Sequence, residues 1–328
     1  MNDEVLIDIQ NLYKYFTVDT SFFGKPTSVL KAVDDVSFQI KKGECFGLVG
    51  ESGCGKSTIG NMLVDLYTPT KGKIIFNGTD LTALPKKERR KYCKDIQLIF
   101  QDPYASLNPR MTVGDTIAEP ILINKLRPKN EIDDRVNYLL NCVGLASNYR
   151  NRYPHEFSGG QRQRIGIARA LAVEPKLIVC DEPVSALDVS IQAQVLNLLS
   201  DLKDEFDLTY LFIAHGLNVV KHISDRVGVM YLGKMMEITS KNELYHNPLN
   251  PYTQALLSAI PSVDPTKRNK RIMLQGDVPS PIDPPEGCRF CSRCFARVEG
   301  CEQYDSRLIE AAENHYVACK LFEKKSEL

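Results

Sequence analysis

Residues 50–58 read GESGCGKST, which fits G-x-x-x-x-G-K-[ST], the pattern of a phosphate-binding loop. The apolar residues before it, CFGLV at 45–49, predict a buried strand. After it, apolar residues recur at helical spacing through Ile59, Met62, Leu63 and Leu66. Strand, glycine loop and helix is the order that phosphate binding requires, because the helix N-terminus adds a partial positive charge. A glycine-rich turn that matches by chance would not need this context.

The residue types within the loop predict how it binds. Glycines let the backbone curl so that successive N–H groups point at phosphate oxygens. Lys56 reaches the β- and γ-phosphates of a nucleotide, and the Ser57 hydroxyl is a ligand for Mg²⁺. We therefore expect the loop to bind a nucleotide through Gly50, Ser52, Gly53, Gly55, Lys56, Ser57 and Thr58.

Composition narrows the class of protein. The length of 328 residues predicts about two domains, and the balance of 41 basic and 41 acidic residues argues against a general nucleic-acid surface. No apolar run approaches the roughly 18 residues of a membrane-spanning helix, and the acidic start is not a secretory signal. We therefore expect the ten cysteines in a reducing compartment, where disulfides are disfavoured.

Polar residues end several apolar strands. In a parallel sheet the strand ends face the ligand crevice, so Asp181 is placed to hold Mg²⁺ and Glu182 to polarise the water that attacks the γ-phosphate. Gln101 is either a ligand for Mg²⁺ or water, or only a cap of its strand. A lone histidine such as His215 is more often structural, but its position at a strand end beside these groups favours a γ-phosphate contact.

A second anion site is predicted at FSGGQRQR, residues 157–164. Ser158 is a good N-cap for the helix that follows, and Gly159, Gly160 and Gln161 expose N–H groups at its positive end. An ordinary capped helix is the alternative, but it would not require the glycine pair. Further along, the tight loop SALD at 185–188 ends on Asp188 and opens another helix.

The rest of the chain is organised around this core. Phe16, at the end of the first strand, is either a core residue or a flat surface for a nucleotide base, and we prefer the second. Residues 102–165 read as a small helical insertion, and proline becomes frequent from about residue 247 onward. The expected further elements are strands Val5–Ile9, Leu30–Ile40 and Arg271–Leu274, edge strands Val227–Tyr231 and Met235–Ile238, and a helix Pro251–Ile260.

Together these motifs resemble the nucleotide-binding subunits of ATP-binding cassette (ABC) transporters over nearly the whole chain. Residues 50–57 match Walker A, 177–182 Walker B and 185–188 the D-loop. Gln101 matches the Q-loop, His215 the switch histidine, and 158–161 the signature motif, with Phe157 where leucine is commoner. The resemblance implies an ATPase with an α/β, P-loop NTPase (RecA-like) core, an antiparallel β subdomain and a helical insertion. In the family, two chains dimerise head to tail, and each signature motif serves the partner's ATP.

A narrower resemblance is to the ATPases of oligopeptide and dipeptide importers, and to the second of their two ATPase subunits. The stretches that carry it are QDPYASLNP at 101–109, NPYTQALL at 250–257, KYF at 14–16, KAVDDV at 31–36 and the cysteine-bearing tail. It implies a heterodimer with another ATPase, two permease subunits, an extracytoplasmic binding protein, and a peripheral location on the cytoplasmic face of the membrane. We expect a nucleotide-binding domain at 1–255 and an extension at 256–328.

Five cysteines lie close together in that proline-rich extension. Such a segment is poor in core residues and suggests a metal staple; four thiolates suit either zinc or an iron–sulfur cluster. The intervals resemble the importer ATPases, where four cysteines hold a [4Fe–4S] cluster, and this resemblance favours iron over zinc. It assigns the ligands as Cys288, Cys294, Cys301 and Cys319 and leaves Cys291 as a spare thiol, where the family often has histidine.

Three other functions compete with a peptide importer. Related importers carry nickel or other small solutes, and the ATPase never touches the cargo. A soluble ABC ATPase acting on ribosomes or nucleic acid usually has two cassettes or a long coiled-coil insertion, and neither is present here. A P-loop kinase would not need the Ser-Gly-Gly-Gln loop. We therefore expect ATP, Mg²⁺ and a [4Fe–4S] cluster as cofactors, and no nucleic-acid partner.

Overall fold

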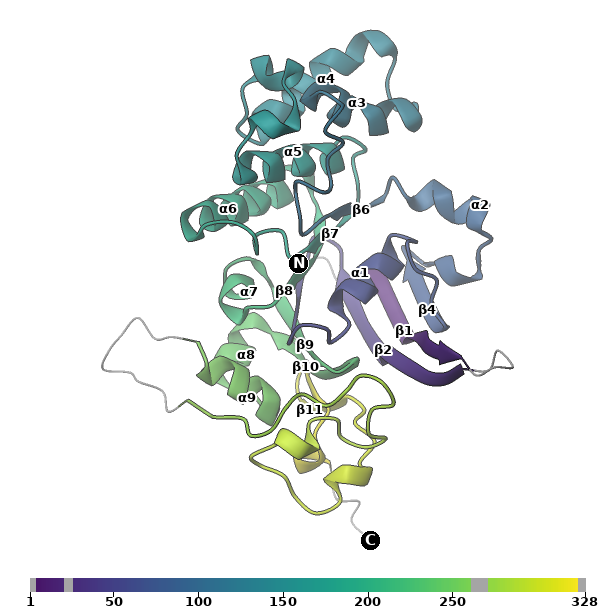
Figure 1. Cartoon of the computed structure of the whole chain (residues 1–328), viewed down its shortest axis with the longest axis vertical. Helices are drawn as coiled ribbons and strands as arrows, with labels where there is room; N and C mark the ends of the chain where they lie inside the picture. The colour runs from purple at the N-terminus through teal and green to yellow at the C-terminus, as the bar shows by residue number, and fades with distance from the viewer. Residues whose placement is uncertain (1–3, 21–25, 261–270, 324–328) are drawn as a thin grey trace.

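Two β-sheets with helices around them form the molecule (Figure 1). The computed structural model describes residues 4–20, 26–260 and 271–323. The larger sheet has the strand order β11-β12-β10-β9-β3-β8-β7-β6, with β9, β3, β8, β7 and β6 parallel. Its strands are β3 (Cys45–Val49), β6 (Ile96–Ile99), β7 (Leu177–Asp181), β8 (Thr209–Ala214), β9 (Arg226–Tyr231), β10 (Lys234–Ser240), β11 (Ile309–Ala312) and β12 (His315–Val317).

The central strands of this sheet are apolar along their length because helices cover them. Every residue of β3 and β8 is buried, as expected for parallel strands packed on both faces. The predicted α/β class and the buried strand before the glycine loop are therefore confirmed. The covering helices are α1 (Lys56–Leu63), α6 (Val189–Phe206), α7 (Leu217–Ile223), α8 (Lys241–His246) and α9 (Pro251–Ser258).

The second sheet is antiparallel, with the order β2-β1-β4-β5. Its strands are β1 (Val5–Thr20), β2 (Pro26–Lys41), β4 (Lys71–Phe76) and β5 (Thr79–Asp80). The first strand is much longer than the predicted Val5–Ile9, so Phe16 lies inside β1, paired with Leu30, and not at its end. One hydrophobic core joins Ile7 and Ile9 of β1 to Ile59 of α1 and Leu48 of β3, which fixes α1 between the two sheets.

The predicted helical insertion forms a separate layer at the top of Figure 1. It contains α3 (Val113–Ile123), α4 (Lys129–Cys142) and α5 (Gly159–Leu171), with the short turns η3 (Ser147–Asn151) and η4 (Pro154–Glu156). The predicted stripe of Val136, Leu139, Leu140 and Val143 is buried in its core. The segment between β5 and β6 holds η1 (Leu81–Ala83), α2 (Lys86–Arg89) and η2 (Arg90–Tyr92).

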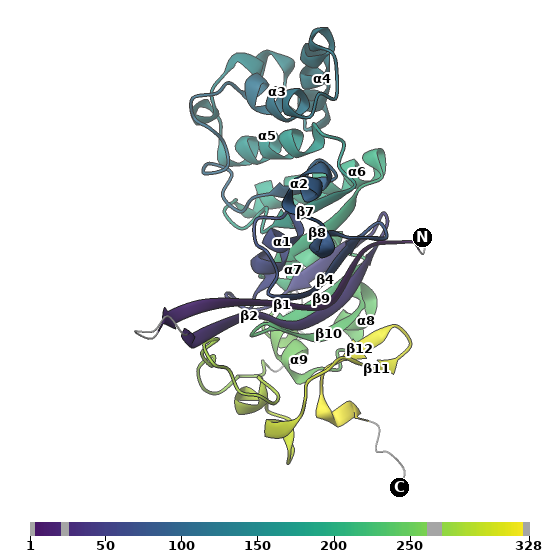
Figure 2. The same ribbon diagram turned by 90° about the vertical axis from the view of Figure 1, so that its right-hand side faces the viewer.

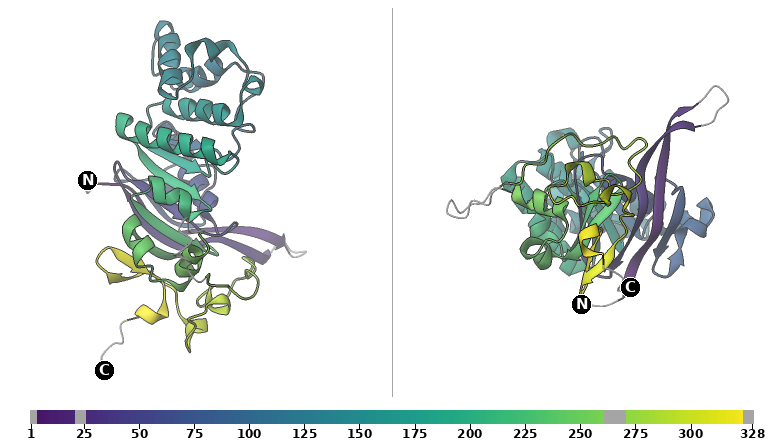
Figure 3. Two further views of the ribbon diagram at one scale, coloured as in Figure 1. Left: turned by 90° about the vertical axis from the view of Figure 1, so that its left-hand side faces the viewer. Right: turned by 90° about the horizontal axis from the view of Figure 1, so that it is seen from below.

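The C-terminal extension lies at the opposite end of the molecule from this helical layer (Figures 2 and 3). Strand β9 lies between β10 and β3, and β12 pairs with β10, so neither β9 nor β10 is the edge strand that was predicted. The predicted strand Arg271–Leu274 is wrong, because these residues have no regular structure. The rest of the extension is loop-rich, as expected, with the turns η5 (Cys291–Arg293), η6 (Cys301–Gln303) and η7 (Lys320–Phe322).

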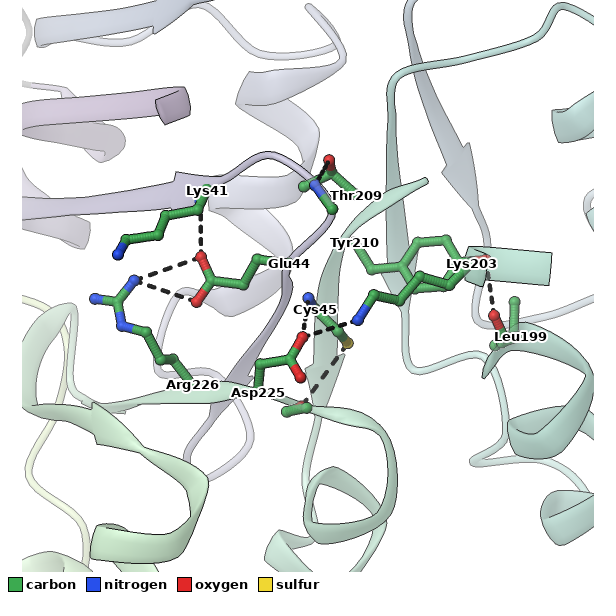
Figure 4. Close-up of polar contacts among 11 residues, drawn as sticks. Lys41, Glu44, Cys45, Leu199, Lys203, Thr209, Tyr210, Asp225 and Arg226 are labelled. Atoms are coloured by element: carbon green, nitrogen blue, oxygen red, sulfur yellow. Dashed lines mark hydrogen bonds and ion pairs between the residues drawn. The ribbon is translucent and has the colours of Figure 1, made fainter. Parts of the chain in front are cut away.

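A polar network fixes the amino ends of β3, β8 and β9 (Figure 4). Arg226 lies 3.2 Å from the buried Glu44 carboxylate. The Asp225 carboxylate accepts a hydrogen bond from the Cys45 N–H at 2.9 Å and pairs with Lys203 at 2.9 Å. The glycine loop follows the other end of β3, so this network stabilises the sheet away from the loop. No helix of the described ranges is long and apolar enough to cross a membrane.

Candidate functional site

The glycine loop leads from β3 into α1, as the sequence predicts. Gly55 precedes the helix with φ 105°, and a Cβ there would lie 2.1 Å from the Ala32 carbonyl oxygen, so only glycine fits. Lys56 is buried, and its Nζ donates to the carbonyls of Gly50 at 2.7 Å and Glu51 at 3.1 Å. The lysine ammonium group therefore lies against the backbone of the loop itself.

Ser57 and Asp181 meet at the start of α1. The Ser57 hydroxyl donates to Asp181 Oδ1 at 2.8 Å. Burial raises the pKa of Asp181 above its usual value, and the nearby Glu182 raises it further, while Ser57, Lys56 and His215 oppose the shift. A hydroxyl and a carboxylate are hard oxygen ligands, which are the donors that Mg²⁺ prefers. The two side chains present therefore fit a magnesium site.

Glu182 lies between two other strand-end residues. Gln101 Nε2 donates to Glu182 Oε2 at 2.8 Å, and His215 Nε2 lies 2.5 Å from Glu182 Oε1. The carboxylate is 5% exposed, whereas His215 is 43% exposed and Ser52 Oγ lies 3.5 Å from its Nδ1. Gln101, which follows β6, therefore donates to Glu182 at the end of the neighbouring strand β7. The exposure of His215 shows that it is not a buried structural histidine. The structure brings together Gln101, Asp181, Glu182 and His215 with the glycine loop.

The second predicted anion site belongs to α5 and contacts α6. Ser158 caps α5: its hydroxyl accepts from the Gln161 N–H at 3.3 Å, and the Gln161 side chain accepts from the Ser158 N–H at 3.0 Å. A Cβ on Gly160 would lie 2.5 Å from Ile191 Cγ2, so the second glycine permits close packing on α6. Asp188 is exposed at the N-terminus of α6. Ser158, Gly159, Gly160 and Gln161 therefore belong to the helical layer, whereas Asp188 belongs to the loop between β7 and α6.

Phe16 is neither a core residue nor fully exposed. Its ring packs edge-on against Tyr67 with 5.5 Å between centroids, and Lys14 Nζ lies 4.9 Å from its centroid. Tyr67 follows α1, so this strand contacts the segment after the loop helix. Two other residues that contact the loop were not predicted from the sequence. The Tyr252 hydroxyl accepts from the Glu51 N–H at 3.0 Å, and Arg293 pairs with the Glu51 carboxylate. No local pattern marks residues this far from the loop along the chain.

All five cysteines of the extension line one cavity of about 20 Å³, roughly the volume that one water needs. Cys291, the spare thiol of the sequence-based expectation, lines this cavity together with the four expected ligands. Burial raises the pKa of Cys288, Cys291 and Cys319, and that of Cys294 to about 11, which favours neutral thiols. Among the described residues, no group of three or more His, Cys, Asp or Glu is arranged to hold a metal ion. The predicted metal-binding character of the extension is therefore not supported by this geometry.

Comparison with known families gives two matches along the chain. The profile described as ABC transporter matches residues 33–185. The profile described as oligopeptide/dipeptide transporter, C-terminal region, matches residues 236–301. The first match contains the glycine loop, Gln101, the Ser-Gly-Gly-Gln loop and the two carboxylates; the second contains four of the five clustered cysteines.

Individual relatives are similar along nearly the whole chain. The sequence is 54% identical to the oligopeptide transport ATP-binding protein AppF of Bacillus subtilis, covering 98% of each chain. It is 53% identical to the oligopeptide transport ATP-binding protein OppF of Salmonella typhimurium, covering 96% of each. Among solved structures, the dimeric ATP-binding cassette MJ0796 bound to ADP and phosphate matches with a TM-score of 0.64 and 28% identity, covering 72% of this chain and 99% of that one. CbiO1 of Clostridium perfringens, part of an ABC transporter complex, matches with a TM-score of 0.65 and 25% identity. The match covers 74% of this chain and 92% of CbiO1.

Proposed function

The chain belongs to the ATP-binding proteins of the ABC transporter family, and on this premise we propose that it drives an importer of oligopeptides or dipeptides. Its enzymatic activity is that of the family, the hydrolysis of ATP. The observation that supports peptides as the cargo is the similarity to oligopeptide transport ATP-binding proteins, which includes the extension as well as the cassette. Uptake of defined peptides by cells with and without this chain is the test; unchanged uptake would contradict the proposal.

We propose that one ATP binds along the glycine loop of each chain. Phe16 stacks on the base, the backbone from Gly50 to Thr58 with Ser52 and Lys56 binds the phosphates, and Ser57, Asp181 and Gln101 hold Mg²⁺. When bound, Mg²⁺ neutralises charge on the phosphate oxygens. Glu182 accepts the proton of the attacking water, and its contacts at 2.5 and 2.8 Å with His215 and Gln101 support this role by orienting the carboxylate.

The signature residues would complete the ATP site of a partner chain. Ser158, Gly159, Gly160 and Gln161 lie at the N-terminus of α5, and Asp188 lies at the N-terminus of α6. Ser158, Gly159 and Asp188 are exposed, which supports a role toward another molecule. The similarity to MJ0796, solved as a dimer with ADP and phosphate, adds to this support. We infer that the partner is a second, different ATPase subunit.

The remaining assignments concern the assembly. We propose a nucleotide-binding domain at 1–255, with its helical part at about 102–165, and an extension at 256–328; residues 261–270 and 324–328 lie outside the described ranges. The ATPase pair would sit peripherally on the cytoplasmic face of the membrane, bound to two permease subunits that receive cargo from an extracytoplasmic binding protein. Nickel or another small solute is the alternative cargo, and an ATPase acting on nucleic acid or ribosomes is a more distant alternative.

The resemblance of the cysteine intervals to those of importer ATPases is the ground for one further assignment, a metal held by the extension. We propose that Cys288, Cys294, Cys301 and Cys319 hold a [4Fe–4S] cluster, with Zn²⁺ as the alternative, as a structural staple. Because partial burial raises the pKa of Cys288, Cys294 and Cys319 and the cysteines line a cavity of about 20 Å³, binding requires loss of these protons and a change in the positions of the thiols. Protein purified without oxygen should contain about four iron and four sulfide per chain. Cys301→Ser should lose the metal and Cys291→Ser should keep it, whereas metal-free protein would contradict this assignment.

A further inference from the structure

The extension contacts the phosphate loop directly through Arg293. Its Nη1 lies 3.0 and 3.2 Å from the two carboxylate oxygens of Glu51, the second residue of the loop, and 3.2 Å from the Tyr231 hydroxyl. The arginine side chain is only 10% exposed, so water screens this ion pair much less than a surface pair. Arg293 ends η5, the turn that begins at Cys291.

Glu51 is also held through its backbone. Its N–H donates to the Tyr252 hydroxyl of α9, and its carbonyl accepts from Lys56 Nζ. The Tyr252 ring packs on Tyr231 and on Phe290 of the extension, with centroids 4.8 and 5.2 Å apart, and all three rings are fully buried. The position of Glu51 therefore depends on the extension and on α9, and it sets where the carbonyl that binds Lys56 lies.

The charge of Glu51 makes this contact relevant to ATP. A carboxylate in a loop that binds phosphates opposes an anionic ligand, because like charges repel. Arg293 neutralises that charge and keeps the carboxylate turned toward the extension. Without Arg293, the Glu51 side chain would be free to approach the phosphates or to pair with Lys56, and either change weakens nucleotide binding.

A second arginine of the same segment contacts β2, the strand paired with β1. The buried Arg289 pairs with Asp34 of β2 and donates to the Leu232 carbonyl. Asp34 accepts a hydrogen bond at 2.5 Å from the hydroxyl of Tyr15, the neighbour of Phe16 on β1. One short segment, residues 289–293, therefore contacts the phosphate loop directly and is linked through Asp34 to Tyr15 of the strand that carries Phe16.

We propose that Arg293 is a positioning residue of the ATP site, through which the extension sets the affinity of the phosphate loop for ATP. The proposal rests on the assignment of the loop as the ATP site. Arg293 acts through Glu51 and touches no reacting atom. The extension thereby contributes a positioning residue to the nucleotide site of the cassette.

The test compares ATP dissociation constants and the kinetics of hydrolysis for single and paired variants of the full chain. Arg293→Gln should raise the dissociation constant and KM by roughly 10-fold, the size expected for loss of a hydrogen bond to a charged group, and leave kcat nearly unchanged. Arg293→Lys should recover part of the affinity, because it restores the charge. Arg297→Gln is the matched control: Arg297 pairs with Glu302 in the same extension but is 48% exposed, so ATP affinity should not change.

Comparing the paired variant with the single variants distinguishes a role of Arg293 in positioning Glu51 from a role in folding alone. In the paired variant Glu51→Gln with Arg293→Gln, ATP affinity should return toward that of Glu51→Gln alone, because the carboxylate that Arg293 neutralises is absent. Glu51→Gln leaves the extension intact, so it remains informative even where Arg293→Gln fails to fold. Unchanged affinity in Arg293→Gln, or fully additive losses, would overturn the inference. Lys56→Ala tests the site itself: if it binds ATP normally, the proposed site is wrong, independently of Arg293.

Discussion

Glu182 Oε1 and His215 Nε2 lie 2.5 Å apart, although the two residues follow different strands, β7 and β8. The strands are parallel neighbours in register from Leu177–Thr209 to Asp181–Ile213, so their carboxyl ends lie at one edge of the sheet. Glu182 has φ 50°, and its N–H donates to the Ile213 carbonyl at 3.0 Å, which turns the side chain toward His215 and Gln101. Sheet register and one turn thus position the carboxylate.

The first prediction concerns this carboxylate. Glu182→Gln should leave ATP binding intact and reduce turnover by roughly 10²-fold or more, because an amide cannot accept the proton of the attacking water. Equilibrium binding and steady-state hydrolysis, measured on the same preparation, give the two quantities. Lys56→Ala serves as the contrasting variant, since it should lose binding. Normal turnover in Glu182→Gln would mean that another group activates the water.

The second prediction concerns the two kinds of site in one chain. His215→Ala should impair the ATP bound to this chain, whereas Gly160→Asp should impair the ATP bound to the partner chain. Each variant is assembled with a wild-type partner, and a photoreactive ATP analogue then reports which chain retains its nucleotide. Impairment of the same site by both variants would contradict the head-to-tail arrangement.

Gly160→Asp needs a folding control. A Cβ at Gly160 would lie 2.5 Å from Ile191, so even Gly160→Ala should destabilise the chain by about 1–3 kcal/mol through overpacking. A Cβ at the neighbouring Gly159 would meet Leu187 at 3.5 Å, which is an ordinary contact, so Gly159→Ala should change thermal stability less. Thermal midpoints of the two alanine variants therefore calibrate the folding cost.

The third prediction concerns docking to the permease. Tyr104 is 56% exposed at the edge of the helical layer, with the Arg162 guanidinium 5.0 Å from its ring centroid, and Arg169 holds the same segment through the Ser106 carbonyl at 2.6 Å. Tyr104→Ala should weaken binding of the permease in a pull-down experiment, because it removes an exposed aromatic ring from a surface that Arg162 and Arg169 hold in place. Phe295→Ala, an exposed aromatic of the extension, is the control. Binding to bare liposomes as strong as binding to permease would contradict a protein-mediated dock.

The sequence predicted the parts of the fold that local patterns specify. Each of these parts has a recognisable pattern within one short stretch of sequence, and each is present in the structure: the glycine loop, the apolar strands β7 and β8, and the apolar stripe on α4. It did not predict the length of β1, since the residues after Ile9 alternate poorly and β1 contains register shifts at several points. Nor did it predict that β12 covers β10, because strand pairing across about 80 residues leaves no local signal.

Some residues of the candidate site could likewise be predicted from local patterns, and others could not. Strand-end residues such as Glu182 and His215 could be found because each ends an apolar run. Arg293 could not, because it lies in an irregular loop and meets Glu51 only through the packing of Phe290 on Tyr231 and Tyr252. Five cysteines could be expected near one another from their spacing, but the size of the cavity that they line and the raised pKa of Cys294 depend on burial, which spacing does not report.

The last prediction concerns pH and the network of Figure 4. Burial raises the pKa of the Glu44 carboxyl, although Arg226 and the Lys41 N–H oppose the shift. Because the folded chain favours the neutral acid, the stabilisation from this group is complete below about pH 4.3, the pKa of an unperturbed glutamate, and is lost as the pH rises through the higher folded-state pKa. The stability of wild type relative to Glu44→Gln should therefore fall as the pH rises from about 4 to 7. Urea unfolding of both chains across this range measures the difference, in which other titrating groups cancel. The unpaired Arg226 left in Glu44→Gln is charged throughout and adds only a constant offset. A difference that grows in favour of wild type with rising pH would show that Arg226 outweighs burial.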